Sequence, residues 1–158
     1  MNDARVNIIA PVRKSIRVNT SQARAFDVFT AGLDRWWPKS HHIGPSAVKQ
    51  LMIEPRVGER WYELGEDGTE TTVGHILIWE PPYRFSVTWE ISGEWQSDPG
   101  PGSEVEVRFI AEGEATTLVE LEHRLFERMG AEGGTKMHDA VERGWPGILD
   151  LFTQAVRE

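Results

Sequence analysis

Hydrophobic spacing changes along the chain and predicts a strand, two short helical segments, a long strand-rich stretch and a final helix. Apolar and polar residues alternate over residues 11–18, and this period of two predicts a half-buried strand. Residues 21–31 place apolar side chains at helical spacing behind a run of N-cap residues, which predicts a short helix. A brief helical turn at residues 33–37 should end at Pro38, because proline has no amide N–H to continue it.

The middle of the chain has the pattern of an antiparallel meander. Short β-rich runs are separated by compact turn signals, and short connections imply that successive strands pair as neighbours. The expected strands lie at residues 47–54, 59–65, 71–80, 84–92, 103–112 and 116–125. With the first strand they predict a seven-stranded sheet that has one apolar and one solvated face.

The last stretch, from about Thr135 to Val156, changes to a helical period. Its apolar stripe contains His138, Val141, Trp145, Ile148, Leu149, Phe152 and Val156. A helix of this length, about 30 Å at 1.5 Å per residue, needs a sheet to cover its stripe. Pro146 is expected to bend it by removing one backbone hydrogen bond. The pattern as a whole predicts an α+β fold in which a curved sheet wraps the long helix.

Composition and charge narrow the classes of protein. The 158 residues are 39% hydrophobic and 27% charged, so we expect a single domain over residues 1–158 with its core at about 11–156. Cysteine is absent, which excludes disulfides and thiolate sites and favours a cytoplasmic location. Residues 1–20 lack the apolar segment of a secretion signal, and no run is long enough for membrane insertion. The net charge of -8 argues against nucleic acid as a partner.

Several segments, in order along the chain, match a known family pattern. They are RAFDVFT at 24–30, DRWWP at 34–38, EPRVGERWYE at 54–63, Gly74 with Ile76, WEPPYRFSVTWE at 79–90, VEVRFIAEGEATTLVELEH at 105–123 and GWPGILDLF at 144–152. This series resembles the SRPBCC, or START-like, superfamily, in the branch of the C-terminal domain of the heat-shock-protein-90 ATPase activator. The resemblance implies a helix-grip fold of the birch-pollen-allergen type. It also implies a cavity between sheet and long helix, in a family where many members bind hydrophobic small molecules and a few are enzymes.

Tryptophan supplies the main candidates for a binding site. Seven tryptophans favour a large core or an aromatic pocket. Strand parity and the helical stripe bring several of them to the interface of sheet and helix, where ligand stacking and plain core packing explain them equally well. The residues expected to line the cavity are Trp36, Trp61, His75, Leu77, Trp89, Val107, Phe109, His123, Trp145, Ile148 and Leu149. Trp95 lies in the glycine-rich loop at residues 93–102, where it is a candidate cap for the cavity or a contact for self-association.

Two histidines within strands are candidates for polar contacts or proton transfer. His123 has the apolar parity, whereas the face of His75 is ambiguous because apolar residues occupy both parities around it. A core histidine with satisfied hydrogen bonds is the simpler interpretation of each. Glu63 and Glu90 are the acidic candidates, and parity places Glu90 on the solvated face.

Three other histidines are weaker candidates for a functional role. His41 and His42 are adjacent in a loop, and neighbouring residues seldom share one tetrahedral metal site, so no metal is expected. His138 opens the final helix, where it either reaches the mouth of the cavity or is solvated.

The sequence carries no nucleophile elbow and no phosphate-binding loop. The leading prediction is binding of a small hydrophobic molecule, aromatic ligands included, in stress response or metabolism and without a cofactor. A cyclase or dehydratase acting on polyketide-like substrates, with His75 or His123 as the acid–base group, is the second hypothesis. A protein-interaction module with a chaperone ATPase as partner is the third. Exposed edge strands and the Trp95 loop also leave a homodimer open.

Overall fold

The computed structural model describes residues 8–100 and 102–158. The expectations for residues 1–7 and for Pro101 in the glycine-rich loop therefore fall outside the described residues. In chain order the elements are β1 (Val12–Val18), α1 (Gln22–Phe29), α2 (Leu33–Trp36), β2 (Val48–Ile53), β3 (Arg60–Gly65), β4 (Glu70–Glu80), β5 (Arg84–Trp89), β6 (Ser103–Ala111), β7 (Thr117–Arg124), the 3-10 helix η1 (Phe126–Met129) and α3 (Ala131–Val156).

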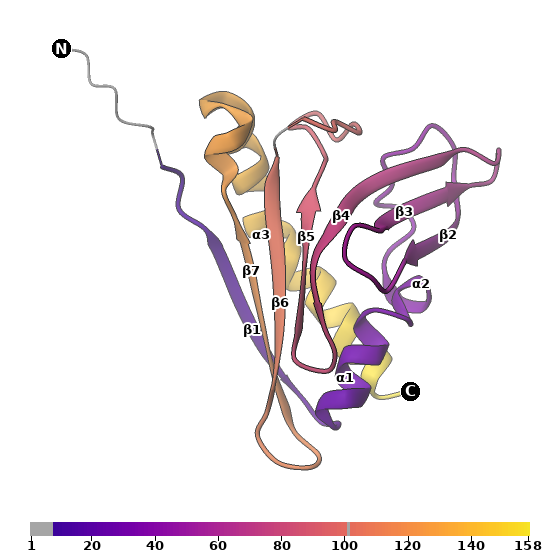
Figure 1. Cartoon of the computed structure of the whole chain (residues 1–158), viewed down its shortest axis with the longest axis vertical. Coiled ribbons are helices and arrows are strands. Elements are labelled where there is room, and N and C mark those ends of the chain that lie inside the picture. The colour runs from indigo at the N-terminus through magenta and orange to yellow at the C-terminus, as the bar shows by residue number, and fades with distance from the viewer. Residues whose placement is uncertain (1–7, 101) are drawn as a thin grey trace.

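The strands form one antiparallel sheet in the order β1-β7-β6-β5-β4-β3-β2. Figure 1 shows α3 lying across one face of this curved sheet, with α1 and α2 packed beside the C-terminal end of α3. The predicted α+β helix-grip fold is therefore confirmed, including the number of strands. No helix in the described ranges is both long and apolar enough to cross a membrane.

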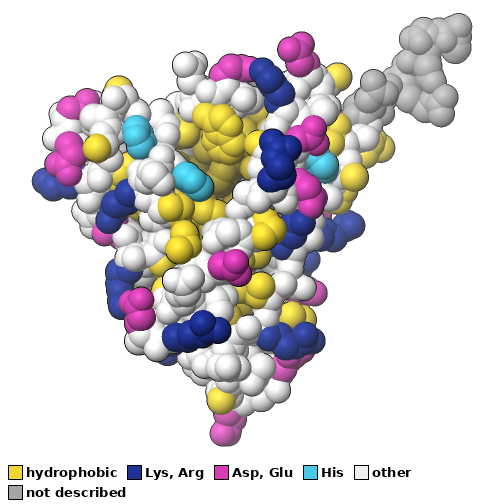
Figure 2. All heavy atoms as spheres, turned by 180° about the vertical axis from the view of Figure 1, so that it is seen from behind, with side chains coloured by type: hydrophobic (Ala, Val, Ile, Leu, Met, Phe, Trp, Pro, Cys, Tyr) yellow, Lys and Arg dark blue, Asp and Glu magenta, His cyan; other side chains and the backbone are white. Residues whose placement is uncertain are grey.

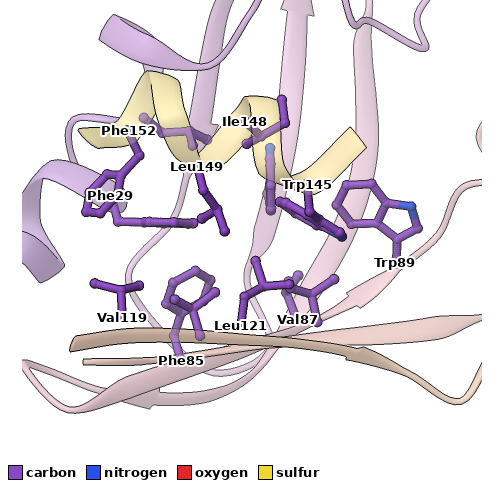
Figure 3. Close-up of a cluster of buried hydrophobic side chains, with 14 of the residues drawn as sticks. Phe29, Phe85, Val87, Trp89, Val119, Leu121, Trp145, Ile148, Leu149 and Phe152 are labelled. Atoms are coloured by element: carbon purple, nitrogen blue, oxygen red, sulfur yellow. The ribbon is translucent and has the colours of Figure 1, made fainter. Parts of the chain in front are cut away.

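The apolar stripe of α3 packs on the concave face of the sheet. In Figure 3, Leu149 and Phe152 point from the helix toward Phe85, Val119 and Leu121 of the strands below. Phe26 and Phe29 of α1 join the same core. This end of the concave face is therefore filled by the side chains of the protein itself.

Two element boundaries differ from the predicted ones by three residues or more. Helix α3 begins at Ala131 rather than at Thr135, and its first turn lies so close to η1 that a Cβ on Gly134 would come within 2.2 Å of the Phe126 carbonyl oxygen. Glycine has no apolar side chain, so the spacing of apolar residues did not reveal the first turn of α3. The fifth strand ends at Trp89 because Ile91 pairs instead with Ser97 in the following loop.

Two register shifts in β4 change which side chains face inward. One shift lies where β4 pairs with β3, and the other where it pairs with β5 between Ile76 and Ile78. Ile76 is buried, whereas Leu77 is 41% exposed and His75 lies on the outer face beside Glu90. The expectation that His75 and Leu77 line the cavity is therefore wrong, because an alternation rule fails wherever a bulge interrupts the strand.

Candidate functional site

A cavity of about 390 Å³ lies between the sheet and the middle of α3. Strands β2, β3, β4 and β5 form one wall, α3 forms the opposite wall, and the loop after α2 closes one side. Figure 2 shows the opening as a hollow lined by hydrophobic side chains, with histidine side chains beside it. The cavity continues the concave face of the sheet beyond the part that α1 fills.

Four of the tryptophans that line this cavity contact one another in a closed cycle. The ring centroids of Trp37 and Trp61 are 5.0 Å apart, and those of Trp61 and Trp89 are 5.7 Å apart. Trp145 closes the cycle at 5.7 Å from Trp89 and 5.9 Å from Trp37. Every contact is edge-on or tilted, a geometry favoured by the aromatic quadrupole. We call these four residues the tryptophan ring.

A fifth tryptophan lies at the rim. Trp95 lines the cavity from the loop after β5 and is 44% exposed. The same loop is joined to α3 by an ion pair of 2.9 Å between Glu94 and Lys136. This placement agrees with a cap over the cavity, one of the two roles considered for Trp95.

The indole N–H groups of the tryptophan ring differ in how they are satisfied. Trp145 donates to Nδ1 of His123 over 3.1 Å. Within the described residues, Nε1 of Trp61 and Nε1 of Trp89 are buried and have no hydrogen-bond acceptor. A buried donor without a partner costs about 1–3 kcal/mol, so most such groups in proteins are satisfied.

The loop after α2 brings polar groups to one side of the cavity. Ser40, His41 and His42 line it there. The buried carboxylate of Glu63 in β3 also lines it, and accepts hydrogen bonds from the backbone N–H groups of Ile43 at 2.9 Å and Gly44 at 3.0 Å. Glu63 therefore ties the histidine-bearing loop to the sheet.

The structure brings four of the predicted cavity residues to the cavity, namely Trp61, Trp89, Trp145 and Ile148. Trp37 takes the place expected for Trp36. Trp36 ends α2, packs against Phe29 and Phe152, and donates to the Val28 carbonyl oxygen at 2.8 Å. Trp37 follows with extended backbone, and its ring lies 5.7 Å from that of Trp36 but lines the cavity. The Trp-Trp pair was visible in the sequence, but the change of direction at the end of α2 was not.

Other predicted cavity residues belong to the solid core instead. Val107, Phe109 and Leu149 are buried and do not line the cavity. Phe109 lies 5.2 Å from Phe26 of α1, measured between ring centroids. The expectation for these residues is wrong because α1 occupies their part of the concave face. Strand parity shows that a side chain points inward, but not whether other side chains fill the space that it faces.

His123 is also a core residue rather than a cavity residue. It is fully buried, with Nε2 at 2.8 Å from the Ser103 hydroxyl and Nδ1 accepting from Trp145. Burial, aided by the nearby charge of His138, lowers the pKa of His123 to about 3. The satisfied core histidine, which was the simpler reading, describes it. Its ring is therefore not placed for proton transfer to a molecule in the cavity.

Two further candidates lie away from the cavity. Glu90 is on the outer face as parity predicted, but it is only 8% exposed rather than solvated. It accepts a hydrogen bond of 2.5 Å from the Thr88 hydroxyl and lies 2.6 Å from Nδ1 of His75. His138 packs edge-on against Phe126 and contacts Asp139, so it does not reach the cavity.

Comparison with known proteins places this architecture in a family. Residues 19–157 match the sequence model described as "Activator of Hsp90 ATPase homolog 1-like protein". No curated protein matches the chain. Among solved structures, an anthrahydroquino-γ-pyrone synthase, Txn09, is 42% identical with a TM-score of 0.65, over 94% of this chain and 97% of that one.

Two further solved structures come from Micromonospora echinospora. The self-sacrificing resistance protein CalC is 32% identical with a TM-score of 0.72, over 92% of this chain and 93% of that one. CalU16 is 23% identical with a TM-score of 0.62, over 93% of this chain and 74% of that one, and this likeness shows the fold alone. With one family model spanning nearly the whole chain, and two relatives above 30% identity, this protein belongs to the activator of Hsp90 ATPase homolog 1-like family.

Proposed function

We propose that the chain binds a planar, polycyclic aromatic molecule of the polyketide type in the cavity that the tryptophan ring lines. The observation that carries this proposal is that four mutually contacting indoles line a cavity of about 390 Å³. Small-molecule sites are commonly about 300–1,000 Å³, mostly apolar, with a few placed polar groups. Flat aromatic walls favour a flat aromatic ligand, because stacking adds to the burial of apolar surface.

The two relatives above 30% identity support this ligand class. One is named as a synthase of an anthrahydroquino-γ-pyrone, a fused aromatic product, and it is matched over nearly the full length of both chains. The other is a resistance protein, which indicates that the family fold also serves functions other than synthesis. The fold alone would not select a ligand, so the proposal rests on the indoles first and on the relatives second.

Ring closure of the bound molecule is a second candidate function. It is favoured by the 42% identity to a synthase and by the histidines His41 and His42 at the side of the cavity. Histidine exchanges protons near neutral pH, which is what a cyclisation of hydroxylated aromatic substrates requires. His75 and His123, the earlier acid–base candidates, lie outside the cavity. Turnover of a polyketide-type substrate that stops when both His41 and His42 are replaced by alanine would favour catalysis over binding alone.

The binding proposal is tested by titration of the protein with anthraquinone, followed by tryptophan fluorescence and by the melting temperature. We expect quenching, together with a melting temperature that rises with ligand concentration, because a ligand that binds only the folded state stabilises it. If neither signal changes up to the solubility limit of anthraquinone, the tryptophan ring is not a site for this class of molecule.

Two neighbouring tryptophans provide a matched pair of variants for this titration. Trp37→Phe changes the tryptophan ring, whereas Trp36→Phe changes an indole that packs in the core. We expect Trp37→Phe to weaken anthraquinone binding by about threefold to tenfold, given the usual size of one aromatic contact, and Trp36→Phe to leave it nearly unchanged. If the two variants lower the affinity for anthraquinone equally, the ligand does not bind against the tryptophan ring.

A further inference from the structure

Glu63 is a buried carboxylate at a mostly apolar cavity. It is 3% exposed and lines the cavity from β3. In the described ranges of the chain it forms no ion pair with a lysine, arginine or histidine. A buried glutamate without a cationic partner is uncommon in proteins, because the charge loses its hydration. Its position therefore needs a reason beyond packing.

Part of the reason is the loop that Glu63 holds. Its two carboxylate oxygens accept from the amides of Ile43 and Gly44, one each. A Cβ on Gly44 would lie 2.7 Å from the Thr71 hydroxyl oxygen and 3.2 Å from Oε1 of Glu63. Glycine at this position thus allows the close approach of the loop to the carboxylate. The contact is built by several residues and fixes where the oxygens of Glu63 lie.

The loop contacts leave acceptor capacity on the carboxylate. An ionised carboxylate has about four lone-pair positions, and the two amides use two of them. Glu63 is the only carboxylate among the described residues that line the cavity, where the other polar side chains are those of Ser40, His41 and His42. Glu63 is thus the strong acceptor at this cavity, and the group that satisfies it best is a hydroxyl donor on the ligand.

We infer that Glu63 is a specificity-determining residue that selects an aromatic ligand carrying a hydroxyl group, by accepting a hydrogen bond from that hydroxyl. The inference rests on the proposed function and adds the chemistry of one ligand substituent to it. A phenolic or enolic hydroxyl fits this role, whereas a ligand carboxylate would be repelled by the charge of Glu63. Glu63 thereby also orients the ligand, with its hydroxyl edge toward the histidine-bearing loop.

A pair of probes tests this selection. 2-Hydroxyanthraquinone and 2-methoxyanthraquinone differ in whether the substituent can donate a hydrogen bond. Their affinities are measured by tryptophan quenching at a mildly acidic pH that keeps the phenol protonated. We expect the unsubstituted protein to prefer the hydroxyl probe by about tenfold or more, because tenfold is the lower end of what a hydrogen bond to a charged group contributes to affinity. In Glu63→Gln the preference should fall to about twofold or less.

Two control variants separate selection from loop anchoring. Gly44→Ala disturbs the loop but keeps the carboxylate, so it should weaken both probes while retaining the preference for the hydroxyl. Glu90→Gln removes another buried, hydrogen-bonded carboxylate on the outer face and should change neither affinity. If Glu63→Gln behaves like Gly44→Ala, with both affinities lower and the preference intact, Glu63 only anchors the loop and the inference is overturned.

The same measurements distinguish failure of this inference from failure of the proposed function. If neither anthraquinone binds the unsubstituted protein, the aromatic-binding proposal itself is wrong. If both bind with equal affinity, the cavity binds the aromatic ring system but Glu63 does not distinguish the hydroxyl from the methoxy substituent. Melting temperatures of the variants without probe show whether each one is folded. If Glu63→Gln does not fold, Glu63→Asp is measured in its place, since it keeps a carboxylate. A Glu63→Asp protein that keeps the preference would support the carboxylate as its source.

Discussion

The indole N–H of Trp145 donates a hydrogen bond of 3.1 Å to Nδ1 of His123, and so joins α3 to β7. Because an indole nitrogen only donates, Nδ1 must be the unprotonated nitrogen of the imidazole. The ring proton then lies on Nε2, toward the Ser103 hydroxyl at 2.8 Å. One face of the cavity thus depends on the tautomer and the charge of a histidine that does not itself line it.

This arrangement predicts that the protein loses stability in acid through His123. Burial lowers the pKa of its imidazole from 6.5 to about 3. As the pH falls below 6.5 the unfolded chain takes up a proton at this residue, whereas the folded protein does not do so until about pH 3. The contribution of neutral His123 is complete above pH 6.5. Between pH 6.5 and 3 it should decline by up to about 1.4 kcal/mol per pH unit. Urea unfolding at a series of pH values measures this slope.

The comparison variant is His123→Gln, whose amide oxygen can still accept from Trp145 but cannot titrate. Other groups contribute to acid unfolding in both proteins, so the difference between the two slopes isolates His123. We expect the variant to be less stable at neutral pH and to lose less stability on acidification. Parallel slopes would show that His123 is protonated to the same extent in the folded and unfolded states.

Replacement of Trp145 tests the packing of α3 on the sheet. Trp145→Ala removes a buried indole and leaves a void beside the existing cavity, so we expect the free energy of unfolding to fall by about 3–5 kcal/mol. The Nδ1 of His123 also loses its donor. Unfolding in urea, followed by circular dichroism, measures the change. A loss below about 1 kcal/mol would mean that this turn of α3 does not pack against the strands.

The unpaired indole donors predict an unequal response to two equivalent substitutions. Trp36→Phe removes an N–H that is bonded to the Val28 carbonyl oxygen, whereas Trp61→Phe removes one that has no acceptor in the described chain. Both changes delete similar apolar surface. We expect Trp61→Phe to cost about 1 kcal/mol less in unfolding free energy than Trp36→Phe. The reason is that it also removes a buried N–H group whose lost hydration is not replaced by a hydrogen bond. Equal costs would indicate that the Trp61 donor finds a partner in solution, such as a bound water.

Most of the fold followed from spacing and turn chemistry. The alternating runs gave all seven strands, and the stripe of α3 identified the element that covers the sheet. These signals are local, since each depends on which face of one element is buried. The errors lie where contacts with another element set the local structure, as at the close contact of Gly134 with η1 and at the two register shifts of β4.

The site was less predictable than the fold, for a physical reason. Trp61, Trp89 and Trp145 were expected at the interface of sheet and helix, and they lie there around the cavity. Phe109 has the same inward parity and is nevertheless buried against α1. Whether an inward residue meets a cavity or a partner is set by the volume that other elements fill, which a single sequence does not encode locally. Glu63 was noted as a candidate, but its loop partners could not be inferred from spacing.

The final prediction concerns Gly74, where β4 changes register. A Cβ at this position would lie 1.7 Å from the carbonyl oxygen of Thr88 and 2.9 Å from a methyl carbon of Val87. Because the first of these atoms is backbone, relief requires the paired strands to separate. We expect Gly74→Ala to lower the unfolding free energy by about 3 kcal/mol or more.

Gly147→Ala is the matched control for this change. It lies on the exposed side of α3 with no atom within 4 Å of an added Cβ, and it should stabilise the protein by about 0.5–1 kcal/mol, the usual gain for alanine inside a helix. Urea unfolding of the two variants side by side gives both values. If Gly74→Ala is as stable as the parent while Gly147→Ala behaves as expected, β4 pairs with β5 in another register. His75 and Leu77 would then have to be placed again relative to the cavity, since their outward position depends on this part of the strand.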